Sequence, residues 1–309
     1  MKYKVAIIGY GYWGPKLTRN FNNSNNFEIK YIVDISRINL NKAKKDFPLS
    51  NVSKNYKFLL KKKIDLAVIA TSTNSHYKIC KYLLSFTNVL VEKPLCLSTK
   101  QVSYLEKLAK KNKKLLFVDY PFIFSGSVSF FSKIIKNNSF GKLNEIESSR
   151  EQAPIRNDMD VIWDLGVHDI SIFNYLLGNN PSVLKTIKYK TKKVKKIDTA
   201  YINLIYKKDI KVIIKNSWIS PVKIRLIKFK FDKAIIYYDE NEPLYKIKIY
   251  TISKTNKSNY NIKIPEIDIR EPLYRLVEYI EKSLKQKKNK IFENNFNLNI
   301  TKTLERISK

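Results

Sequence analysis

Short hydrophobic runs alternate with longer amphipathic stretches through the first 120 positions of the chain. This alternation is typical of βαβ units and predicts a parallel sheet with helices between its strands. The run at 66–70 is apolar at every position, as expected of a strand buried on both faces. We predict strands at residues 4–9, 28–34, 66–71, 89–92 and 115–119, and helices at 14–22, 39–47, 75–84 and 99–112.

The pattern changes after residue 121, where helices and then a succession of strands are expected. Ala200, Ile202, Leu204 and Tyr206 recur with period two, which indicates a largely antiparallel sheet with one covered face. Gly178 follows a predicted helix, as glycine often does at a helix C-terminus. Helices are predicted at 127–136, 163–177, 271–284 and 298–307, strands between 198 and 250, and exposed loops or edge hairpins at 190–196 and 253–261.

The length of 309 residues and the hydrophobic content of 44% allow two domains with cores of ordinary size. We place an α/β Rossmann domain with a doubly wound parallel sheet at residues 1–120, and an α/β domain with a mostly antiparallel sheet at 121–309. No apolar run approaches the roughly 20 residues of a membrane-spanning helix, and the apolar stretch near the N-terminus is too short for a signal peptide. We expect a cytoplasmic protein with no membrane partner.

Lysine and arginine outnumber the acidic residues and give a formal net charge of +32. Such an excess attracts polyanions, but here it is spread along the whole chain and accompanies abundant Asn, Ile and Tyr. An AT-rich coding sequence produces the same mixture, so we expect no nucleic-acid partner, while the charge fits a small polyanionic substrate. Cys80 and Cys96 are the only cysteines, and His76 and His168 the only histidines, which excludes a disulfide framework and a metal site built from these residue types.

A glycine motif follows the first predicted strand and opens the first predicted helix. In such a motif the first glycine makes a tight turn, the second lets the backbone approach a pyrophosphate, and the third lets helix and strand pack closely. The N-terminus of the helix adds partial positive charge for the phosphates. The motif is Gly9-Tyr10-Gly11-Tyr12-Trp13-Gly14, and it predicts a dinucleotide site.

Asp34 stands 20 residues after Gly14, at the end of the second predicted strand. A carboxylate at this place accepts hydrogen bonds from the adenosine ribose hydroxyls and repels a 2′-phosphate. We therefore expect NAD as the cofactor, with NADP less favoured, although Arg37 could offset part of the repulsion. Trp13 is expected to pack on the cofactor or at a domain interface.

Further segments complete a pattern that resembles the Gfo/Idh/MocA oxidoreductases over essentially the whole chain. They are Ala70-Thr71-Ser72-Thr73-Asn74-Ser75-His76, Glu92-Lys93-Pro94-Leu95 and Trp163-Asp164-Leu165-Gly166-Val167-His168-Asp169-Ile170. The stretch Ser217-Trp218-Ile219-Ser220-Pro221-Val222-Lys223-Ile224-Arg225 and the tripeptide Glu271-Pro272-Leu273 are similar to a branch tied to surface-polysaccharide sugars. That branch includes dehydrogenases that oxidise C3 of UDP-N-acetylglucosaminuronic acid.

The resemblance implies a Rossmann domain, then an α/β domain with an open, mostly antiparallel sheet whose open face serves a homodimer or homotetramer. It implies that the nicotinamide lies between the domains and that the Lys93–Pro94 bond is cis. Tyr120 and Phe124 stand where relatives often carry histidine and tyrosine, which bears on the substrate rather than on the reaction type. The cofactor-binding residues expected from the motifs and the resemblance are Gly9, Gly11, Tyr12, Trp13, Gly14, Asp34, Arg37, Thr71, His76, Glu92 and Lys93.

Hydride transfer from a secondary alcohol to NAD requires that the hydroxyl proton leaves as the carbonyl forms. A histidine, whose pKa lies near neutrality, serves best as the general base. His168 and Asp164 are four residues apart, so on a helix they share one face and Asp164 could orient the imidazole. A lysine ammonium would stabilise the developing alkoxide. The resemblance assigns the catalytic roles to Lys93 and His168, with Asp164 beside them and Asp169 as a candidate for substrate or structural hydrogen bonding.

These features predict an NAD(P)-dependent sugar dehydrogenase or ketosugar reductase that acts on CH–OH groups, with a nucleotide-linked sugar as its substrate in surface-polysaccharide synthesis. The alternatives are a free-sugar or inositol dehydrogenase of the same family, and a non-catalytic dinucleotide-binding sensor. The presence of both Lys93 and His168 argues against the sensor. For His76 two roles remain open, shaping the nicotinamide pocket or serving as an ordinary histidine at the start of a helix.

Overall fold

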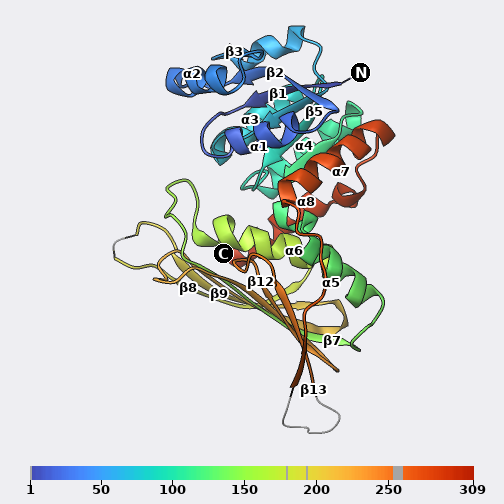
Figure 1. The fold of residues 1–309 in the computed structure, drawn as a ribbon. Helices are drawn as coiled ribbons and strands as arrows, with labels where there is room; N and C mark the ends of the chain where they lie inside the picture. The colour runs from blue at the N-terminus through green and yellow to red at the C-terminus, as the bar shows by residue number, and fades with distance from the viewer. Residues whose placement is uncertain (1, 179, 193, 253–259) are drawn as a thin grey trace. The chain divides into compact units, whose positions relative to one another are not determined.

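A computed structural model describes residues 2–178, 180–192, 194–252 and 260–309 of the chain. The chain separates into two compact units, and each contains one sheet (Figure 1). Unit 1 comprises Met1–Pro121 and Glu271–Thr301, and unit 2 comprises Phe122–Arg270 and Lys302–Lys309. Within the described ranges, no helix combines the length and the apolar composition that crossing a membrane requires.

Unit 1 is built on a six-stranded parallel sheet in the order β3-β2-β1-β4-β5-β6. The strands and helices predicted for residues 1–120 are confirmed, with ends that differ by at most two residues. β3 lies outside the predicted set because it is a three-residue strand without a buried position. The elements are β1 (Tyr3–Ile8), α1 (Gly14–Asn22), β2 (Phe27–Val33), α2 (Arg37–Asp46), β3 (Asn51–Ser53), the 3₁₀ turn η1 (Tyr56–Lys61), β4 (Leu66–Ile69), α3 (Thr73–Leu83), β5 (Asn88–Glu92), α4 (Thr99–Lys111) and β6 (Leu116–Asp119).

The C-terminal segment Glu271–Thr301 also belongs to unit 1. Asn289 holds it there, because its Nδ2 donates to the Leu116 carbonyl (2.8 Å) and its Oδ1 accepts from the Tyr279 hydroxyl (2.9 Å). The boundary drawn from the sequence assigned this segment to the second domain. The apolar stripe of an amphipathic helix shows that the helix packs, but not which domain it packs against. The elements of the C-terminal region are α7 (Pro272–Gln286), the 3₁₀ turn η5 (Lys290–Phe292) and α8 (Phe296–Ser308), whose last residues belong to unit 2.

Unit 2 is built on an eight-stranded sheet in the order β14-β13-β12-β11-β7-β10-β9-β8, which α5 and α6 cover on one face (Figure 1). Among the described strands of this second sheet, only the pair β7 and β10 is parallel, so the expected mostly antiparallel sheet is confirmed. Ala200, Ile202, Leu204 and Tyr206 of β9 are all buried, as their period-two spacing predicts.

The elements of this unit are the 3₁₀ turn η2 (Pro121–Phe124), α5 (Gly126–Lys136), β7 (Leu143–Glu151), the π-helical turn η3 (Ile162–Gly166), α6 (Val167–Leu177), β8 (Ser182–Tyr189), β9 (Thr199–Tyr206), the 3₁₀ turn η4 (Lys207–Asp209), β10 (Ile210–Ser217), β11 (Ile224–Phe231), β12 (Ile235–Asp239), β13 (Ile247–Ile252) and β14 (Tyr260–Lys263). β7 and β8 lie outside the predicted set, because β7 buries the polar Ser148 and Arg150 and β8 has no buried position. The stretch 190–196 joins the antiparallel strands β8 and β9, as expected of an edge hairpin, with Lys193 outside the described residues. Of the loop predicted at 253–261, residues 253–259 lie outside the described residues and the last two belong to β14.

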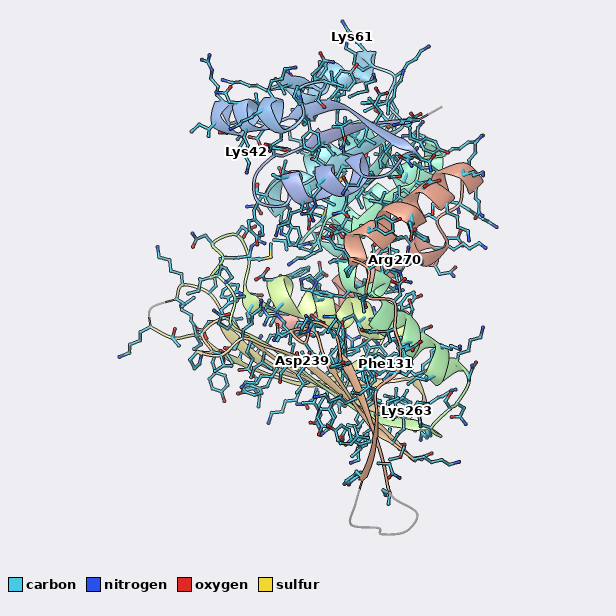
Figure 2. The ribbon with its side chains drawn as sticks, viewed as in Figure 1. Lys42, Lys61, Phe131, Asp239, Lys263 and Arg270 are labelled. Carbon is cyan, nitrogen blue, oxygen red and sulfur yellow. The ribbon has the colours of Figure 1, made fainter. Side chains whose placement is uncertain are left out.

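Phe131 packs α5 onto the sheet of unit 2 (Figure 2). Its ring is fully buried and stacks on Phe229 of β11, with ring centroids 3.9 Å apart. Phe131→Ala should lower the free energy of unfolding by about 3–5 kcal/mol, because it removes a buried ring and leaves a cavity. Chemical denaturation measures this loss. The neighbouring Phe130 is only half-buried, so Phe130→Ala should cost much less, and equal losses in the two variants would contradict this packing.

Candidate active site

The glycine loop of unit 1 joins β1 to α1, and its three glycines meet three different steric demands. Gly9 has a φ of +95°, and a Cβ on it would lie 2.6 Å from the Ala70 carbonyl oxygen. A Cβ on Gly14 would overlap the Gly9 carbonyl, so α1 starts in close contact with the turn. A Cβ on Gly11 would meet no described atom within 4 Å. The loop is therefore tightly packed at its ends and open at its second glycine, which fits the approach of a dinucleotide pyrophosphate.

Asp34, directly after β2, is tied to this loop. Its Oδ2 accepts from the backbone N–H of Tyr10 (2.6 Å) and from Asn39 Nδ2 (3.2 Å), and its Oδ1 accepts from the backbone N–H of Ser36 (2.8 Å). The structure thus brings the predicted carboxylate and the glycine loop together. Arg37 is exposed at the first position of α2. The hydrogen bonds of Asp34 to ribose hydroxyls stay a prediction.

Tyr12 and Trp13 form an aromatic cluster with Lys16 beside the glycine loop. Their rings meet edge to face with centroids 5.6 Å apart, and Lys16 Nζ lies 3.8 Å from the Tyr12 centroid and 4.3 Å from the Trp13 centroid. Cation–π attraction holds the ammonium group over both rings. The cluster adds a positive charge next to the predicted phosphate site. The packing of Trp13 on a cofactor stays a prediction.

His76 links two loops that follow strands of the same sheet. It lies in the first turn of α3, is buried, and places Nδ1 2.9 Å from the Pro94 carbonyl oxygen and Nε2 3.1 Å from the Thr71 carbonyl oxygen. The Lys93–Pro94 peptide bond is cis, as the resemblance implies. His76 therefore connects the loop after β4 to the loop that carries Lys93. An ordinary histidine at the start of a helix would not need these two contacts.

Lys93 follows β5 and is the one buried lysine among those that the structure describes, with 9% of its surface exposed. Glu92 is also buried, and its Oε2 accepts from the backbone N–H of Lys93 at 3.2 Å. The parallel register of β5 and β6 pairs Glu92 with Asp119. Burial raises the pKa of Asp119 well above its usual value, Glu92 raises it further, and Lys93 lowers it. The sequence analysis gave Asp119 no role in the site. Its position as an acidic residue at the end of an apolar strand was the feature that could have identified it.

Asp164 lies in unit 2, and the turn that carries it is not the regular α-helix expected for 163–177. Residues Ile162–Gly166 form a π-helical turn with i→i+5 hydrogen bonds. The expectation that Asp164 and His168 share one face assumed the i→i+4 geometry of a regular α-helix, which this turn does not have. Asp160 begins this turn by accepting from the backbone N–H groups of Ile162 (3.0 Å) and Trp163 (3.1 Å). Burial raises the pKa of Asp160, although these two bonds oppose the shift.

Asp164 is held by two side chains to which the sequence analysis assigned no role in the site. Its Oδ2 accepts from Trp218 Nε1 at 3.0 Å, and Arg156 lies 3.6 Å from its Oδ1. Trp218 stands directly after β10, so the π-helical turn is fixed against the end of that strand. A tryptophan N–H needs a partner when it is buried, which makes Trp218 a residue that positions Asp164.

His168 lies in the first turn of α6 and is half-buried against Phe122, with ring centroids 5.0 Å apart and an interplanar angle of 83°. The Arg150 guanidinium lies 4.6 Å from the Phe122 centroid. Phe122 therefore packs between the histidine and a buried cation. The sequence analysis assigned no role to Phe122 or to Arg150, and the strand that carries Arg150 is polar at seven of its nine positions.

The sequence allowed Asp169 either a substrate-binding role or a structural role, and its contacts are structural. It is fully buried and accepts from Ser148 Oγ (2.8 Å), Arg150 Nε (2.8 Å) and Asn216 Nδ2 (3.0 Å). Arg150 also pairs with both oxygens of Glu240. Burial alone would lower the pKa of Arg150, but Glu240 and Asp169 more than offset it, and the pKa is raised.

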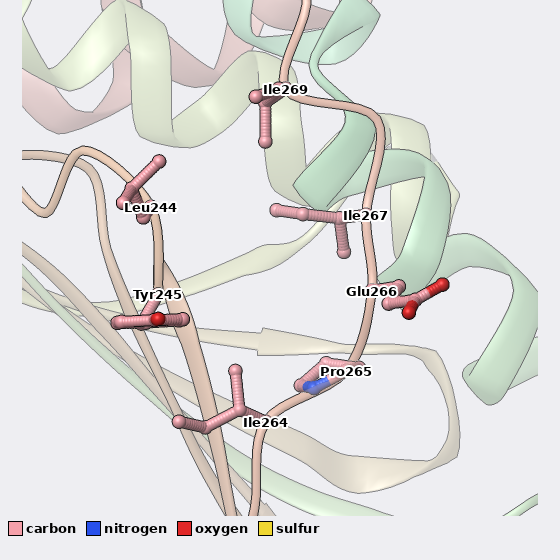
Figure 3. Close-up of a pocket in the computed structure, with 7 residues that line it drawn as sticks. All are labelled: Leu244, Tyr245, Ile264, Pro265, Glu266, Ile267 and Ile269. Carbon is pink, nitrogen blue, oxygen red and sulfur yellow. The ribbon is translucent and has the colours of Figure 1, made fainter.

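The predicted site residues thus fall into two groups. Unit 1 holds the glycine loop, Asp34, Arg37, Thr71, His76, Glu92 and Lys93, and unit 2 holds Asp164 and His168. The meeting of Lys93 with His168 stays a prediction. An apolar pocket of about 580 Å³ in unit 2 contains none of these residues (Figure 3). It is lined by Leu244, Tyr245, Ile264, Pro265, Glu266, Ile267 and Ile269.

Residues 3–120 match the model of the Gfo/Idh/MocA oxidoreductase family, NAD-binding Rossmann fold. Unit 1 therefore contains a Gfo/Idh/MocA family domain. The chain is also 24% identical over 128 residues to a UDP-N-acetylglucosamine 3-dehydrogenase of Acidithiobacillus ferrooxidans, a match that covers 40% of this chain and 39% of that protein. The sequence match thus spans less than half the length of this curated relative.

Solved structures share the fold over nearly the whole chain. An oxidoreductase from Agrobacterium radiobacter in complex with NAD+, L-tartaric acid and magnesium has a TM-score of 0.86 at 15% identity, covering 99% of this chain and 95% of that chain. KijD10, a 3-ketoreductase from Actinomadura kijaniata in complex with TDP-benzene and NADP, has a TM-score of 0.87 at 12% identity and coverages of 99% and 97%. The Acidithiobacillus ferrooxidans dehydrogenase GnnA has a TM-score of 0.85 at 16% identity and coverages of 100% and 97%. At these identities the likeness shows the two-domain α/β fold.

The glycines of the Gfo/Idh/MocA domain allow a matched test of cofactor binding. Gly11→Ala adds a methyl group into open space, so it should leave the free energy of unfolding nearly unchanged and weaken NAD binding by about tenfold or more, which is roughly 1.4 kcal/mol. Gly14→Ala collides with the Gly9 carbonyl and should reduce both stability and binding. Isothermal titration with NAD and chemical denaturation separate the two effects. Unaltered NAD affinity in a folded Gly11→Ala protein would contradict the assignment of this loop.

Proposed function

We propose that the chain is an NAD-dependent oxidoreductase that transfers a hydride between nicotinamide and a CH–OH group of a sugar. The observation that carries this proposal is the burial of Lys93 at the end of a strand of the dinucleotide-binding sheet. A lysine is strongly hydrated and is seldom buried, and the other described lysines are exposed or half-buried. A buried ammonium group beside a cofactor site fits stabilisation of charge that develops during a reaction.

The glycine loop and Asp34 would hold the cofactor. The backbone N–H groups at the start of α1 would bind the pyrophosphate, and Asp34 would bind the ribose hydroxyls. Bound NAD supplies the hydride acceptor. We favour NAD over NADP because the Asp34 carboxylate would repel a 2′-phosphate, while the Arg37 side chain is exposed to solvent.

The proton and the developing negative charge are handled by Lys93 and His168. The His168 imidazole would accept the hydroxyl proton as the C–O bond becomes a carbonyl, and in reduction it would return that proton. The Lys93 ammonium would stabilise the negative charge on the same oxygen. Phe122 restricts the orientation of the His168 ring, and Trp218 fixes the π-helical turn that leads into α6.

We further propose that the sugar is linked to a nucleotide and belongs to surface-polysaccharide synthesis. Two relatives support this choice, since one is named a UDP-N-acetylglucosamine 3-dehydrogenase and the other is a 3-ketoreductase solved with TDP-benzene. The net charge of +32 is suited to an anionic diphosphate. The proposed site could catalyse either the oxidation of the hydroxyl group or the reduction of the ketone.

We also propose that the protein is a homodimer or homotetramer that pairs through the sheet of unit 2. The side chains that alternate with the buried ones point away from α5 and α6 and leave apolar surface exposed on several strands. Tyr201, Ile213 and Tyr237 are 37%, 40% and 36% exposed. A second copy would remove this surface from water.

The substrate class can be tested by thermal shift with NAD or NADP in combination with UDP-sugars, dTDP-sugars, free hexoses and inositol. We expect NAD to raise the melting temperature more than NADP, and a nucleotide sugar to raise it further, because a ligand that binds only the folded state stabilises it. Stabilisation by a free sugar alone would indicate a free-sugar dehydrogenase. Stabilisation by NAD without any effect of a sugar would favour the dinucleotide-binding sensor.

The catalytic roles can be tested with Lys93→Ala and His168→Ala. Each variant should lower kcat by about 10²–10⁴, because each removes a group that acts on the reacting oxygen. NAD affinity should change little, since the glycine loop and Asp34 are intact. Lys100→Ala, which removes an exposed lysine on α4, is the control and should retain full activity. Full activity in His168→Ala would remove this histidine as the general base.

A further inference from the structure

Two buried carboxyl groups lie next to Lys93 in unit 1. Glu92 is the last residue of β5 and Asp119 the last residue of β6, and the register of the two parallel strands pairs them. Only 6% of the Glu92 surface and 1% of the Asp119 surface are exposed. Water therefore screens neither carboxyl group from the other.

Paired residues of parallel strands project to the same face of the sheet, so the two carboxyl groups lie side by side, and Oδ1 of Asp119 is buried with no described hydrogen-bond donor. An ionised carboxylate can only accept hydrogen bonds, so two carboxyl groups that lie side by side form a hydrogen bond only if one of them carries a proton. Two negative charges in contact inside a protein also disfavour ionisation of both groups, as in other carboxyl pairs that share a proton. The raised pKa of Asp119, caused first by burial and then by Glu92 and opposed by Lys93, agrees with this reading.

Glu92 connects the carboxyl pair to the backbone that carries Lys93. Its Oε2 accepts from the Lys93 backbone N–H at 3.2 Å. On the other side of Lys93, the Pro94 carbonyl lies 2.9 Å from His76 Nδ1. The position of the lysine backbone is thus fixed by a carboxylate before it and by an imidazole after it.

We propose that Glu92 and Asp119 share one proton, and that Asp119 is a positioning residue which acts through Glu92 on Lys93. The protonated Asp119 donates to Glu92, which keeps Glu92 in place to accept from the Lys93 backbone. The pair also presents one negative charge, rather than two, to the Lys93 ammonium. The existence of the pair rests on the geometry of unit 1 alone, whereas its effect on turnover rests on the proposed function.

Infrared spectroscopy of the full chain tests the shared proton directly. At pH 7 the protein should show the C=O stretch of a protonated carboxylic acid, and Asp119→Asn should remove it because an amide replaces the protonated group. Glu106→Gln is the matched control. Glu106 is another carboxyl of unit 1 whose pKa burial raises, with Asn297 and the Leu298 backbone opposing the shift. This variant should leave the band of the Glu92–Asp119 pair in place.

The dependence of stability on pH gives a second readout that needs no activity. A carboxyl whose pKa is raised on folding stabilises the protein fully below the unfolded value of about 3.9, and this contribution is lost as the pH rises toward the native value. The amide that replaces the carboxyl in Asp119→Asn does not titrate in this range. The melting temperature of the unaltered protein should therefore fall more steeply above about pH 4 than that of Asp119→Asn.

Kinetics test the positioning role. Asp119→Ala removes the donor to Glu92 and should lower kcat by about tenfold with a much smaller change in the KM for NAD. Asp119→Asn keeps an N–H donor and should restore most of that loss. Glu106→Gln should retain the kcat of the unaltered protein. Asp119→Asn should lose the infrared band and still recover most of the kcat lost in Asp119→Ala. Such a recovery would assign the effect of Asp119 to its hydrogen bond to Glu92 and not to packing alone.

The outcomes separate the two proposals. If Asp119→Asn changes neither the infrared spectrum nor the slope of melting temperature against pH, the shared proton is overturned, whatever the activity. If the shared proton is present but Asp119→Ala has normal kcat, the positioning role is overturned. A protein that shows the pair but no turnover with any sugar and NAD would contradict the proposed function instead.

Discussion

Parallel strand pairing brings the carboxyl ends of β1, β2, β4, β5 and β6 to one edge of the unit 1 sheet, and the proposed chemistry of this unit depends on that edge. The register aligns Ile8 with Val33 and with Ile69, so the residues that follow these strands emerge together. The glycine turn and Asp34 are then close enough for a 2.6 Å hydrogen bond between the Tyr10 backbone and the carboxylate. Ligands of open parallel sheets bind at such an edge, and the same pairing places Lys93 there.

A buried arginine has a comparable organising effect within unit 2. Removing the Arg150 guanidinium from water is costly unless its charge is paired, and Asp169 and Glu240 provide both partners. These contacts tie β7, the first turn of α6 and the end of β12 together, with Phe122 packed between the cation and His168. Buried ionic networks add less to stability than hydrophobic packing does, so we interpret this one as fixing a single arrangement around the histidine.

The local elements of unit 1 were predictable because their signals are local. β4 is an unbroken apolar run, and the glycine motif gives the turn its position. The features that the sequence did not give have non-local causes. The π-helical turn at Ile162–Gly166 depends on Asp160 before it and on Trp218, which binds Asp164 from a position more than fifty residues later. Likewise, the apolar stripe of α7 predicted a packed helix, but the contact of Asn289 with Leu116 decided that it belongs to unit 1.

By itself, the sequence determined the strands and helices of residues 1–120 apart from β3, the dinucleotide turn and the identity of Lys93 and His168 as candidates, since spacing and residue type suffice for these features. Only the tertiary structure decided which carboxylates act as structural partners. Asp169 is committed to Ser148, Arg150 and Asn216, and Asp119 pairs with Glu92. These pairings join residues far apart in the chain, and the protonation of a carboxyl group depends on burial and neighbouring charge, which arise only when the strands pair and exclude water.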